Sequence, residues 1–331
     1  MTAPLSLFYA EPDPDRWLPG DRFPRRWIRR LARGPRRPGG QERVFINLCA
    51  GLDRLGVPYT VNRYRHALRN PDMPIGIIGK SHVLDLQPWH NPILFGASIM
   101  SHPLEDPKLL ERLPNIRRVL VPGEWMRAMC APYWGDRVQS WPVGIDTQAW
   151  APPATADRDV DVLVYDKVRW EHDHYQRELI DPILTKLRSR GLRVATIRYG
   201  YYKEEDFAAL LRRTRSMIFL CEHETQGIAY QQTLACGIPI FAWDRGGYWQ
   251  DPQYYPDRIR FGPVSSVPYW DERCGLTFSD ATAFTATFDA FWDNVSAQRY
   301  RPRDYILENL TLEKCAQLYL DQWHTTFGSV A

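Results

Sequence analysis

Short apolar runs alternate with stretches of helical period along most of this chain of 331 residues. The run at 5–10 (LSLFYA) is typical of a buried strand, and Val44, Leu48 and Leu52 recur at helical spacing. Strands that alternate with helices favour doubly wound parallel sheets, so the pattern predicts an α/β protein. Strands are expected at 5–10, 58–62, 74–79, 92–100, 117–122, 138–142, 161–165, 193–198, 216–221, after Pro239 and at 275–279, and helices from Gly40 and at 124–133, 174–190, 204–214, 281–295 and 311–326.

A break rich in Pro and Gly divides this alternation into two rounds. The stretches PVGID at 142–146 and WAPPAT at 150–155 are typical of a turn and a linker between domains. A chain of this length has room for two domains of ordinary size. We therefore expect a first domain at 1–145, with a Pro-, Arg- and Trp-rich insertion at about 11–38, and a second domain at 150–300.

The segment 222–243 (EHETQGIAYQQTLACGIPIFAW) carries the strongest functional signal. The strand at 216–221 runs into Glu224, Gly227 stands at the start of a helix that carries Gln232, and Gly-x-Pro leads into the next strand. An acid at a strand end can bind hydroxyl groups, and the amides at a helix start can bind phosphates. These groups together suit a nucleotide sugar.

This segment resembles the E-x7-E region of retaining glycosyltransferases of the GT-B fold, especially glycosyltransferase family 4. Their usual wording is roughly E-G-F-G-x-x-x-x-E-A-M-A-x-G-x-P-V, whereas this chain reads E-x7-Q because Gln232 holds the second acidic position. The turn at 142–146 also resembles the family's hinge, and the resemblance covers nearly the whole chain. It implies two Rossmann-like domains facing a central cleft, the first for the acceptor and the second for the nucleotide sugar. The last helix, about 305–331, would then join the first domain.

The resemblance also implies a donor site at this motif. Glu224 would bind donor-sugar hydroxyls, with Thr225 and Gln226 in place of the usual glycine and aromatic residue. The amides of Gly227 and Ile228 would meet the pyrophosphate. Gln232 would bind the ribose more weakly than a carboxylate, because it accepts one hydrogen bond and donates another. From the residues alone, Glu224 could be an exposed loop acid near a helix start, and Gln232 a helix-surface residue.

Positive charge is needed beside a phosphate leaving group, because negative charge builds on it in the transition state. Lys167 and Arg169 follow the first strand of the second domain, where family members place basic residues; a solvated charge pair is the alternative. Gly39-Gly40 matches the family's glycine loop, and an ordinary turn explains it almost as well. His102 follows the strand at 92–100, where family members often carry a His near the reacting sugar. It is either a substrate-positioning residue or a structural one, and Glu224 and His102 are the catalytic candidates.

The turn WDRGGY at 243–248 resembles the loop that follows the Gly-x-Pro strand in the family. Its Asp244, Gly246 and Gly247 either line the donor cleft or form a tight turn. The aromatic residues around and after it are dense, and they suit either sugar stacking or packing. They are Tyr248, Trp249, Tyr254, Tyr255, Tyr269 and Trp270.

A bound metal is not expected from this sequence. Asp-x-Asp triplets occur at 13–15, 157–159 and 159–161, but none follows a complete nucleotide-binding half. His172-x-His174 lacks an obvious third ligand. The sequence therefore predicts no metal and no cofactor, with a nucleotide diphosphate sugar as the donor substrate.

The net charge of +3 conceals a local excess, because residues 21–37 hold eight Arg against one Asp. Within it, Trp27 shares a helical stripe with apolar neighbours, while Arg25, Arg26, Arg29 and Arg30 occupy the rest. This pattern suits an anionic membrane surface. A solvated or protein-contacting insertion is an equal alternative, and a phosphate-rich acceptor or nucleic acid is a weaker one.

Composition and cysteine usage are typical of a soluble cytoplasmic protein. Apolar residues make up 44% and charged residues 24% of the chain. The six cysteines show no C-x-x-C pair or framework spacing, which indicates a reducing compartment. No apolar run approaches a membrane span, and the first residues lack a signal-peptide pattern. We expect a cytoplasmic protein, peripheral at the inner face of the membrane if the basic stretch binds lipid.

The sequence hypothesis is a metal-independent retaining glycosyltransferase of the hexosyl or a related type. It would move a sugar from a nucleotide diphosphate sugar to a glycan or lipid-linked acceptor in surface polysaccharide biosynthesis. The alternative is a catalytically weak or inactive GT-B protein that binds a nucleotide or glycan. A dinucleotide-dependent oxidoreductase is disfavoured, because no G-x-G-x-x-G follows either leading strand.

Overall fold

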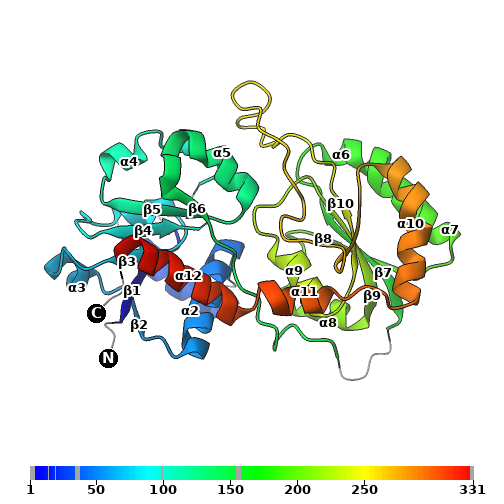
Figure 1. Ribbon diagram of the computed structural model, residues 1–331, viewed down its shortest axis with the longest axis horizontal. Coiled ribbons are helices and arrows are strands. Elements are labelled where there is room, and N and C mark those ends of the chain that lie inside the picture. Colours follow the sequence, from blue (N-terminus) through cyan, green and yellow to red (C-terminus); the bar gives the residue numbers. More distant parts are fainter. Residues whose placement is uncertain are drawn as a thin grey trace. The chain divides into compact units, whose positions relative to one another are not determined.

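The computed structural model describes residues 4–13, 15–18, 20–33, 38–97, 100–153 and 158–328, without the side chains of residues 26, 30, 32 and 33. The chain forms two compact units (Figure 1). Unit 1 comprises residues 1–122, 130–141 and 316–331, and unit 2 comprises residues 123–129 and 142–315. Each unit is built on one parallel sheet, which confirms the predicted α/β class.

Unit 1 contains a six-stranded sheet in the order β2-β1-β3-β4-β5-β6, with every neighbouring pair parallel. Its strands are β1 (Leu5–Phe8), β2 (Tyr59–Val61), β3 (Ile75–Ile77), β4 (Ile93–Gly96), β5 (Ile116–Val121) and β6 (Val138–Ser140). Its helices are α1 (Arg22–Arg33), α2 (Gly40–Leu55), α3 (Tyr64–Arg69), α4 (Leu109–Arg112), the end of α5 (Glu124–Trp134) and most of α12 (Leu312–Phe327). Strands β1, β3 and β4 are buried at every position, because helices cover both faces of a parallel sheet.

Helix α12 packs on the middle of this sheet at a glycine. A side chain at Gly76 of β3 would begin 2.2 Å from the Tyr319 hydroxyl of α12 and 2.9 Å from Leu7 Cδ2. Tyr319 is fully buried and meets the Trp141 ring edge-on at 5.3 Å. The missing side chain of Gly76 therefore sets how closely α12 approaches β3.

Unit 2 contains a five-stranded parallel sheet in the order β11-β10-β9-β7-β8. Its strands are β7 (Val160–Lys167), β8 (Val194–Arg198), β9 (Thr214–Cys221), β10 (Ile240–Trp243) and β11 (Gly275–Phe278). Its helices are α6 (His172–Tyr175), α7 (Asp181–Ser189), α8 (Glu204–Arg213), α9 (Ile228–Ala235), α10 (Ala281–Ser296) and α11 (Pro302–Asn309).

Successive residues of β9 enter two different cores, because neighbouring strand side chains point to opposite faces. Met217 and Phe219 pack with α8 and α9, whereas Ile218 and Leu220 pack with α7 and α10. On the second face, Phe241 lies between two rings of α10. Its centroid is 5.2 Å from that of Phe284 and 5.0 Å from that of Phe291. This burial on both faces fixes the sheet edge that carries the candidate site.

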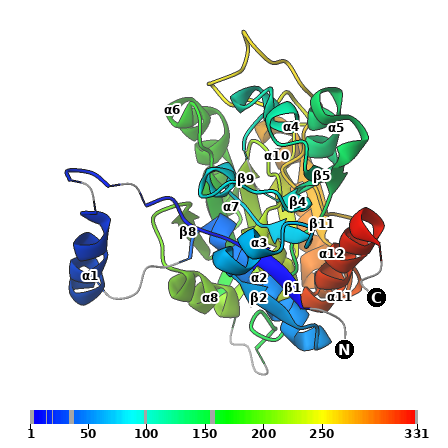
Figure 2. The same ribbon diagram turned by 90° about the vertical axis from the view of Figure 1, so that its left-hand side faces the viewer.

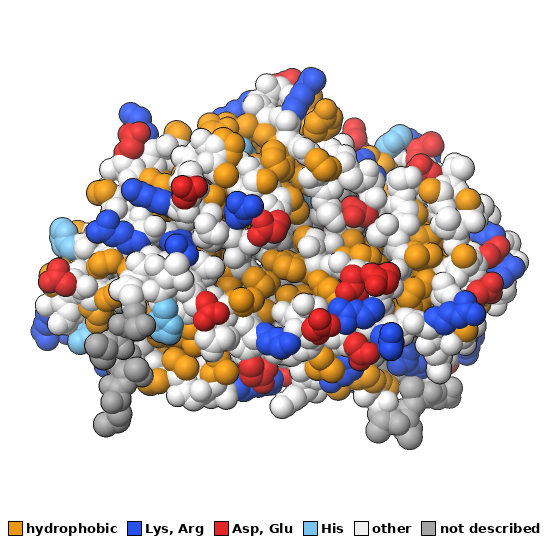
Figure 3. Space-filling view, viewed as in Figure 1, with side chains coloured by type: hydrophobic (Ala, Val, Ile, Leu, Met, Phe, Trp, Pro, Cys, Tyr) orange, Lys and Arg blue, Asp and Glu red, His pale blue; other side chains and the backbone are white. Residues whose placement is uncertain are grey.

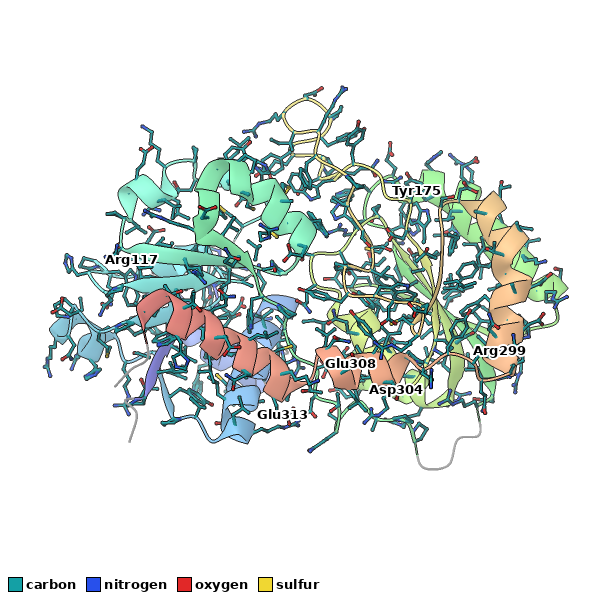
Figure 4. The ribbon with its side chains drawn as sticks, viewed as in Figure 1. Arg117, Tyr175, Arg299, Asp304, Glu308 and Glu313 are labelled. Carbon is teal, nitrogen blue, oxygen red and sulfur yellow. The ribbon has the colours of Figure 1, made fainter. Side chains whose placement is uncertain are left out.

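Helix α11 holds the predicted hinge turn within unit 2. The Arg303 guanidinium donates to the carbonyls of Thr147 at 2.9 Å, Trp150 at 3.1 Å and Ala235 at 2.5 Å. Ile145 also bridges to Thr311 in a parallel pair. Asp304 and Glu308 are labelled on this helix in Figure 4. The turn at 142–150 is therefore fixed to the same unit as the sheet β7–β11.

The elements found differ from those expected in a few places. The helix expected at 174–190 is found at 172–189 as α6 and α7, which a π-helical stretch at Gln176–Ile180 joins. The strand expected at 92–100 ends at Gly96, and residues 98 and 99 lie outside the described part. The short helices α3 and α11 were not predicted, because each is too short to show a clear helical period.

We expect Gly76→Ala to lower the free energy of unfolding by about 1–3 kcal/mol, because the new methyl group overpacks the contact between β3 and α12. Chemical denaturation of the parent and the variant measures this. The matched control is Gly40→Ala, since nothing lies within 4 Å of a side chain at Gly40. An equal loss in both variants would contradict the packing role of Gly76.

Candidate functional site

Charged residues gather at the edge of unit 2 where its parallel strands end. Strand β7 ends at Lys167, which is in register with Cys221 at the end of β9. Glu224 stands three residues beyond that point, and Tyr199 follows the last residue of β8. Carboxyl ends of parallel strands meet at one edge of the sheet, which is where open α/β sheets bind their ligands.

Lys167 and Glu224 form an ion pair through Nζ and Oε1. Their side chains are only 12% and 10% exposed. Burial lowers the pKa of Lys167, but Glu224, Cys221 and Tyr199 together outweigh it, so the pKa lies above its ordinary value. The ammonium also lies 4.4 Å from the centre of the Tyr199 ring. Lys167 therefore carries its charge at neutral pH in a largely enclosed place.

Glu222 organises the loop that carries Arg169. Its Oε1 accepts from the backbone amides of Arg169 at 2.8 Å and Trp170 at 2.9 Å. Its Oε2 has no hydrogen-bond partner among the described residues and lies 3.7 Å from Arg169 Nε. The Arg169 guanidinium stacks on the Trp170 ring, with its carbon 4.2 Å from the ring centre. Since the Arg169 side chain is 34% exposed, it presents a fixed cation to solvent.

His223 lies between Glu222 and Glu224 in the sequence and is buried, with only 3% exposed. Burial lowers its pKa to about 3, and the positive charges of Arg169, Arg245 and Lys167 add to the shift. The ring lies close to two donors, Arg169 at 3.4 Å and the Gln250 amide at 3.4 Å. His223 is therefore a neutral imidazole at physiological pH, and it connects the β7 and β10 loops.

Arg245 is the third cation of this edge and follows β10. Its guanidinium donates to the Tyr175 hydroxyl at 2.5 Å and to the Gln250 side chain. Tyr175, labelled in Figure 4, closes α6. The neighbouring Asp244 accepts from the Ser265 hydroxyl at 2.8 Å and the Ser266 amide at 3.0 Å. Asp244 thus closes the loop of residues 244–266, and both Asp244 and Arg245 are half-buried.

The turn after Glu224 depends on Gly227 and Gln226, whose conformations are closely constrained. Gly227, the N-cap of α9, has φ +80°, and a side chain there would begin 2.0 Å from the Tyr230 ring. The Oε1 of the Gln226 side chain accepts a hydrogen bond from Val143 N at 3.1 Å, and its Nε2 donates one to Gln231 Oε1 at 2.9 Å. The Gln226 side chain, predicted to meet the donor, therefore secures the turn. The first amides of α9, from Ile228 onward, have no partner within the helix.

Two polar groups near this turn have no hydrogen-bond partner among the residues that the structure describes. They are the Gln232 side-chain amide and the second carboxylate oxygen of Glu224, although the two residues are only 7% and 8% exposed. Neither group is among the fully enclosed polar atoms, so each is open to a hydrogen bond from water or a ligand. Thr225, the remaining predicted residue of this turn, is half-buried.

The other predicted residues belong to unit 1 or to the β10 loop. His102 is buried, and its Nδ1 accepts from the Leu104 amide at 3.1 Å, which caps a short 3-10 turn. Gly39 is the N-cap of α2, and Gly40 is its first residue. Gly246 has φ +62° and, like Gly247, forms part of the turn after β10.

Sequence reasoning missed three residues of this edge: Glu222, His223 and Arg245. Arg245 directly follows the Asp244 that was chosen, so the strand-end rule could have found it. Glu222 and His223 lie inside the motif segment, but no pattern in the sequence shows that their side chains are buried.

The described acids of the last two Asp-x-Asp triplets form ion pairs, whereas Asp157 lies outside the described residues. Asp159 pairs with Arg213, and Asp161 pairs with Arg193 at 3.0 Å and Arg215 at 3.2 Å. Among the described residues, no group of three His, Cys, Asp or Glu side chains could hold a metal ion. His172 instead lies 2.7 Å from Asp166. All six cysteines are free.

None of the described helices has the length and apolar character required to span a bilayer. This finding concerns the helices of the described residues alone.

No protein-family model and no curated protein matches this sequence. Solved structures do match it. AviGT4, a glycosyltransferase involved in avilamycin A biosynthesis, is 14% identical with a TM-score of 0.51, and the match covers 98% of both chains. Sucrose-phosphate synthase from Thermosynechococcus elongatus is 13% identical with a TM-score of 0.52 and covers 98% of this chain and 99% of its own.

The fold is of the GT-B type. A mutant of S. aureus TarM, in complex with fondaparinux, alpha-GlcNAc-glycerol and UDP, also matches at 13% identity with a TM-score of 0.53. That match covers 77% of this chain but only 55% of TarM, so the chain spans about half the length of that protein. At such identities the likeness shows the fold, and function must be argued from the site.

We expect His223 to make the unfolding free energy fall as the pH drops from about 6.5 toward 3. Its folded-state pKa lies below its unfolded value, so the unfolded state binds the proton first and gains from acid. The slope from this one group approaches about 1.4 kcal/mol per pH unit within that window.

Denaturation at several pH values measures this slope, which should be shallower in His223→Gln. The control is His324→Gln, which alters an exposed histidine of α12 and should keep the slope of the parent. Equal slopes in all three proteins would refute the assignment of a buried neutral imidazole at position 223.

Proposed function

We propose that this protein transfers a sugar from a nucleotide diphosphate sugar to a glycan or lipid-linked acceptor. The observation that carries this is the enclosed Lys167–Glu224 pair at the carboxyl edge of the second sheet, directly before the start of α9. It combines a cation for phosphate, an acid for hydroxyl groups and unpaired helix amides within one short segment. The similarity of fold to glycosyltransferases, AviGT4 among them, supports the proposal.

The cations suit the leaving group of such a reaction. As the bond between sugar and diphosphate breaks, negative charge builds on the diphosphate. Lys167 is held charged by Glu224, and Arg169 is held by Glu222 and Trp170, so neither needs to be reorganised when the charge develops. The amides at the start of α9 add the positive end of a helix dipole. These groups would supply the electrostatic stabilisation by themselves. The proposed reaction therefore uses no bound metal.

The two unpartnered groups suit the donor's hydroxyls. Oε2 of Glu224 has room for a hydrogen bond from a sugar hydroxyl while Oε1 holds Lys167. The Gln232 amide can accept from one ribose hydroxyl and donate to the other. We assign the sugar to Glu224 and the ribose to Gln232. The resemblance of the motif extends this to a retaining transfer of a hexose or related sugar in surface polysaccharide biosynthesis.

We expect Glu224→Gln to reduce sugar transfer by about 100-fold, because it removes the negative charge that holds Lys167 and replaces one of the two acceptor oxygens with an amide donor. The donor is first selected from UDP-, GDP- and dTDP-sugars by the largest thermal stabilisation. Donor hydrolysis and transfer are then measured with that sugar. The matched control, Glu272→Gln, alters an exposed loop acid of the same unit and should retain the parent's activity. Equal activity of Glu224→Gln and the control would refute the role of Glu224.

We expect Gln232→Ala to weaken the binding of the selected nucleoside diphosphate by roughly tenfold, the value of one or two hydrogen bonds. Calorimetry measures the dissociation constant, and Gln317→Ala on the exposed side of α12 is the control. Unchanged affinity would exclude Gln232 from the ribose site. Tight nucleotide binding in the parent without hydrolysis or transfer would favour a protein that binds donors without turning them over.

A further inference from the structure

Helix α1 and the segment before it carry the most exposed large apolar side chains of unit 1. Along its apolar side, the exposed fractions are 59% for Phe23, 69% for Trp27, 64% for Ile28 and 70% for Leu31. The segment before it adds Trp17 and Leu18, which are 76% and 70% exposed. Figure 2 shows that α1 stands apart from the sheet of its own unit, so this apolar side is not part of the core. Exposed apolar clusters of this kind mark interaction surfaces.

The sequence of α1, RFPRRWIRRLAR, separates its residues into two halves. At 3.6 residues per turn, Phe23, Trp27 and Leu31 lie on successive turns of one side, with Ile28 beside them. The arginine positions of the helix all fall on the opposite half by the same period. Of these, Arg22, Arg25 and Arg29 have described side chains, whereas those of Arg26, Arg30 and Arg33 lie outside the described residues.

Acidic residues hold the helix from its charged side. Arg25 pairs with Asp13 at 3.3 Å and with Asp21 at 3.8 Å, and Arg22 lies 3.9 Å from Asp15. Asp21 also accepts from the Trp17 amide at 2.9 Å. These bonds order the turn before α1 and leave its apolar side uncovered by any of these acids.

The charge of α1 differs from that of the remaining surface. On the face shown in Figure 3, acidic and basic side chains are interspersed. Around α11, for example, Arg273 pairs with both Asp271 and Glu308. The α1 helix contains no acidic residue. Its partner must therefore be anionic and must also accept an apolar surface.

We propose that α1 docks this protein on the surface of a bilayer rich in anionic phospholipids. Phe23, Trp27, Ile28 and Leu31 enter the boundary between head groups and acyl chains, and the arginines meet the lipid phosphates. A nucleic acid would use the arginine half and leave the apolar half exposed. A second copy of α1 would cover the apolar half and leave the arginine half without an anionic partner. A bilayer surface satisfies both halves of the helix at once.

This docking is separate from the proposed sugar transfer, because binding to vesicles needs neither donor nor turnover. A failure of vesicle binding would not count against the proposed donor site, and a failure of sugar transfer would not count against vesicle binding.

The test is co-sedimentation of the full chain with vesicles of phosphatidylcholine alone and of phosphatidylcholine mixed equally with phosphatidylglycerol. We expect binding to the mixed vesicles to be at least about tenfold tighter, and to weaken as salt rises, because the lipid charge is screened. The variant Trp27→Glu with Leu31→Glu should reduce binding to the mixed vesicles by at least about tenfold. The control, Leu68→Glu with Leu86→Glu, makes the same charge change at exposed leucines of unit 1 and should bind like the parent.

Thermal unfolding of both double variants checks that they are folded, and sedimentation equilibrium without lipid gives the state of association. Equal binding by variant and control would overturn the proposal, as would parent binding that ignores phosphatidylglycerol. Self-association that is lost only in Trp27→Glu with Leu31→Glu, without vesicle binding, would assign the helix to contact between copies instead. Tight binding of a short RNA that is unaffected by the same variant, again without vesicle binding, would assign its arginines to nucleic acid.

Discussion

The parallel pairing of β7 with β9 is the constraint on which the candidate site depends. Because Lys167 and Cys221 are in register, the chain leaves both strands at the same level, and Glu224 reaches Lys167 after a turn of only two residues. Both side chains are nearly enclosed, so each charge needs the other. Removing one partner of a buried pair strands the other charge at a cost of about 3–5 kcal/mol. The pair therefore fixes the position of the turn that begins α9, and with it the direction of the helix amides.

Glu222 and His223 extend this constraint to the neighbouring loops. Glu222 uses one oxygen to hold two backbone amides of the β7 loop, which places Arg169, while His223 contacts both that loop and Gln250. Three cations surround His223, and the imidazole remains neutral there because burial and those charges disfavour its protonation. A neutral ring can separate Arg169 from Arg245 without adding a fourth positive charge. The edge thus keeps the Arg169 side chain partly exposed while its loops stay connected.

The sequence predicted the backbone of this site better than its side-chain roles. Gly227 was found because a glycine at a helix start has a physical signature, and the structure shows the reason in its positive φ and in the Tyr230 ring. Lys167 was found from its place at a strand end. Glu222 was not singled out and Gln226 was assigned to the donor, since a carboxylate that binds amides and a side chain that binds Val143 look like any polar residue in a turn. Tertiary contact, absent from any local pattern, decides such roles.

The same reasoning separates α1 from the rest of the chain. Its apolar and arginine positions have the period of a surface helix, and elsewhere in the two units such a helix buries its apolar stripe against a sheet, as α10 does with Phe284, Phe288 and Phe291. In α1 the stripe faces solvent, so local pattern and tertiary packing disagree there. Such a disagreement in a folded protein marks a surface whose partner is another body. The carboxyl edge of the second sheet is a smaller case, since the Gln232 side-chain amide has no partner among the described residues and stays open to a ligand.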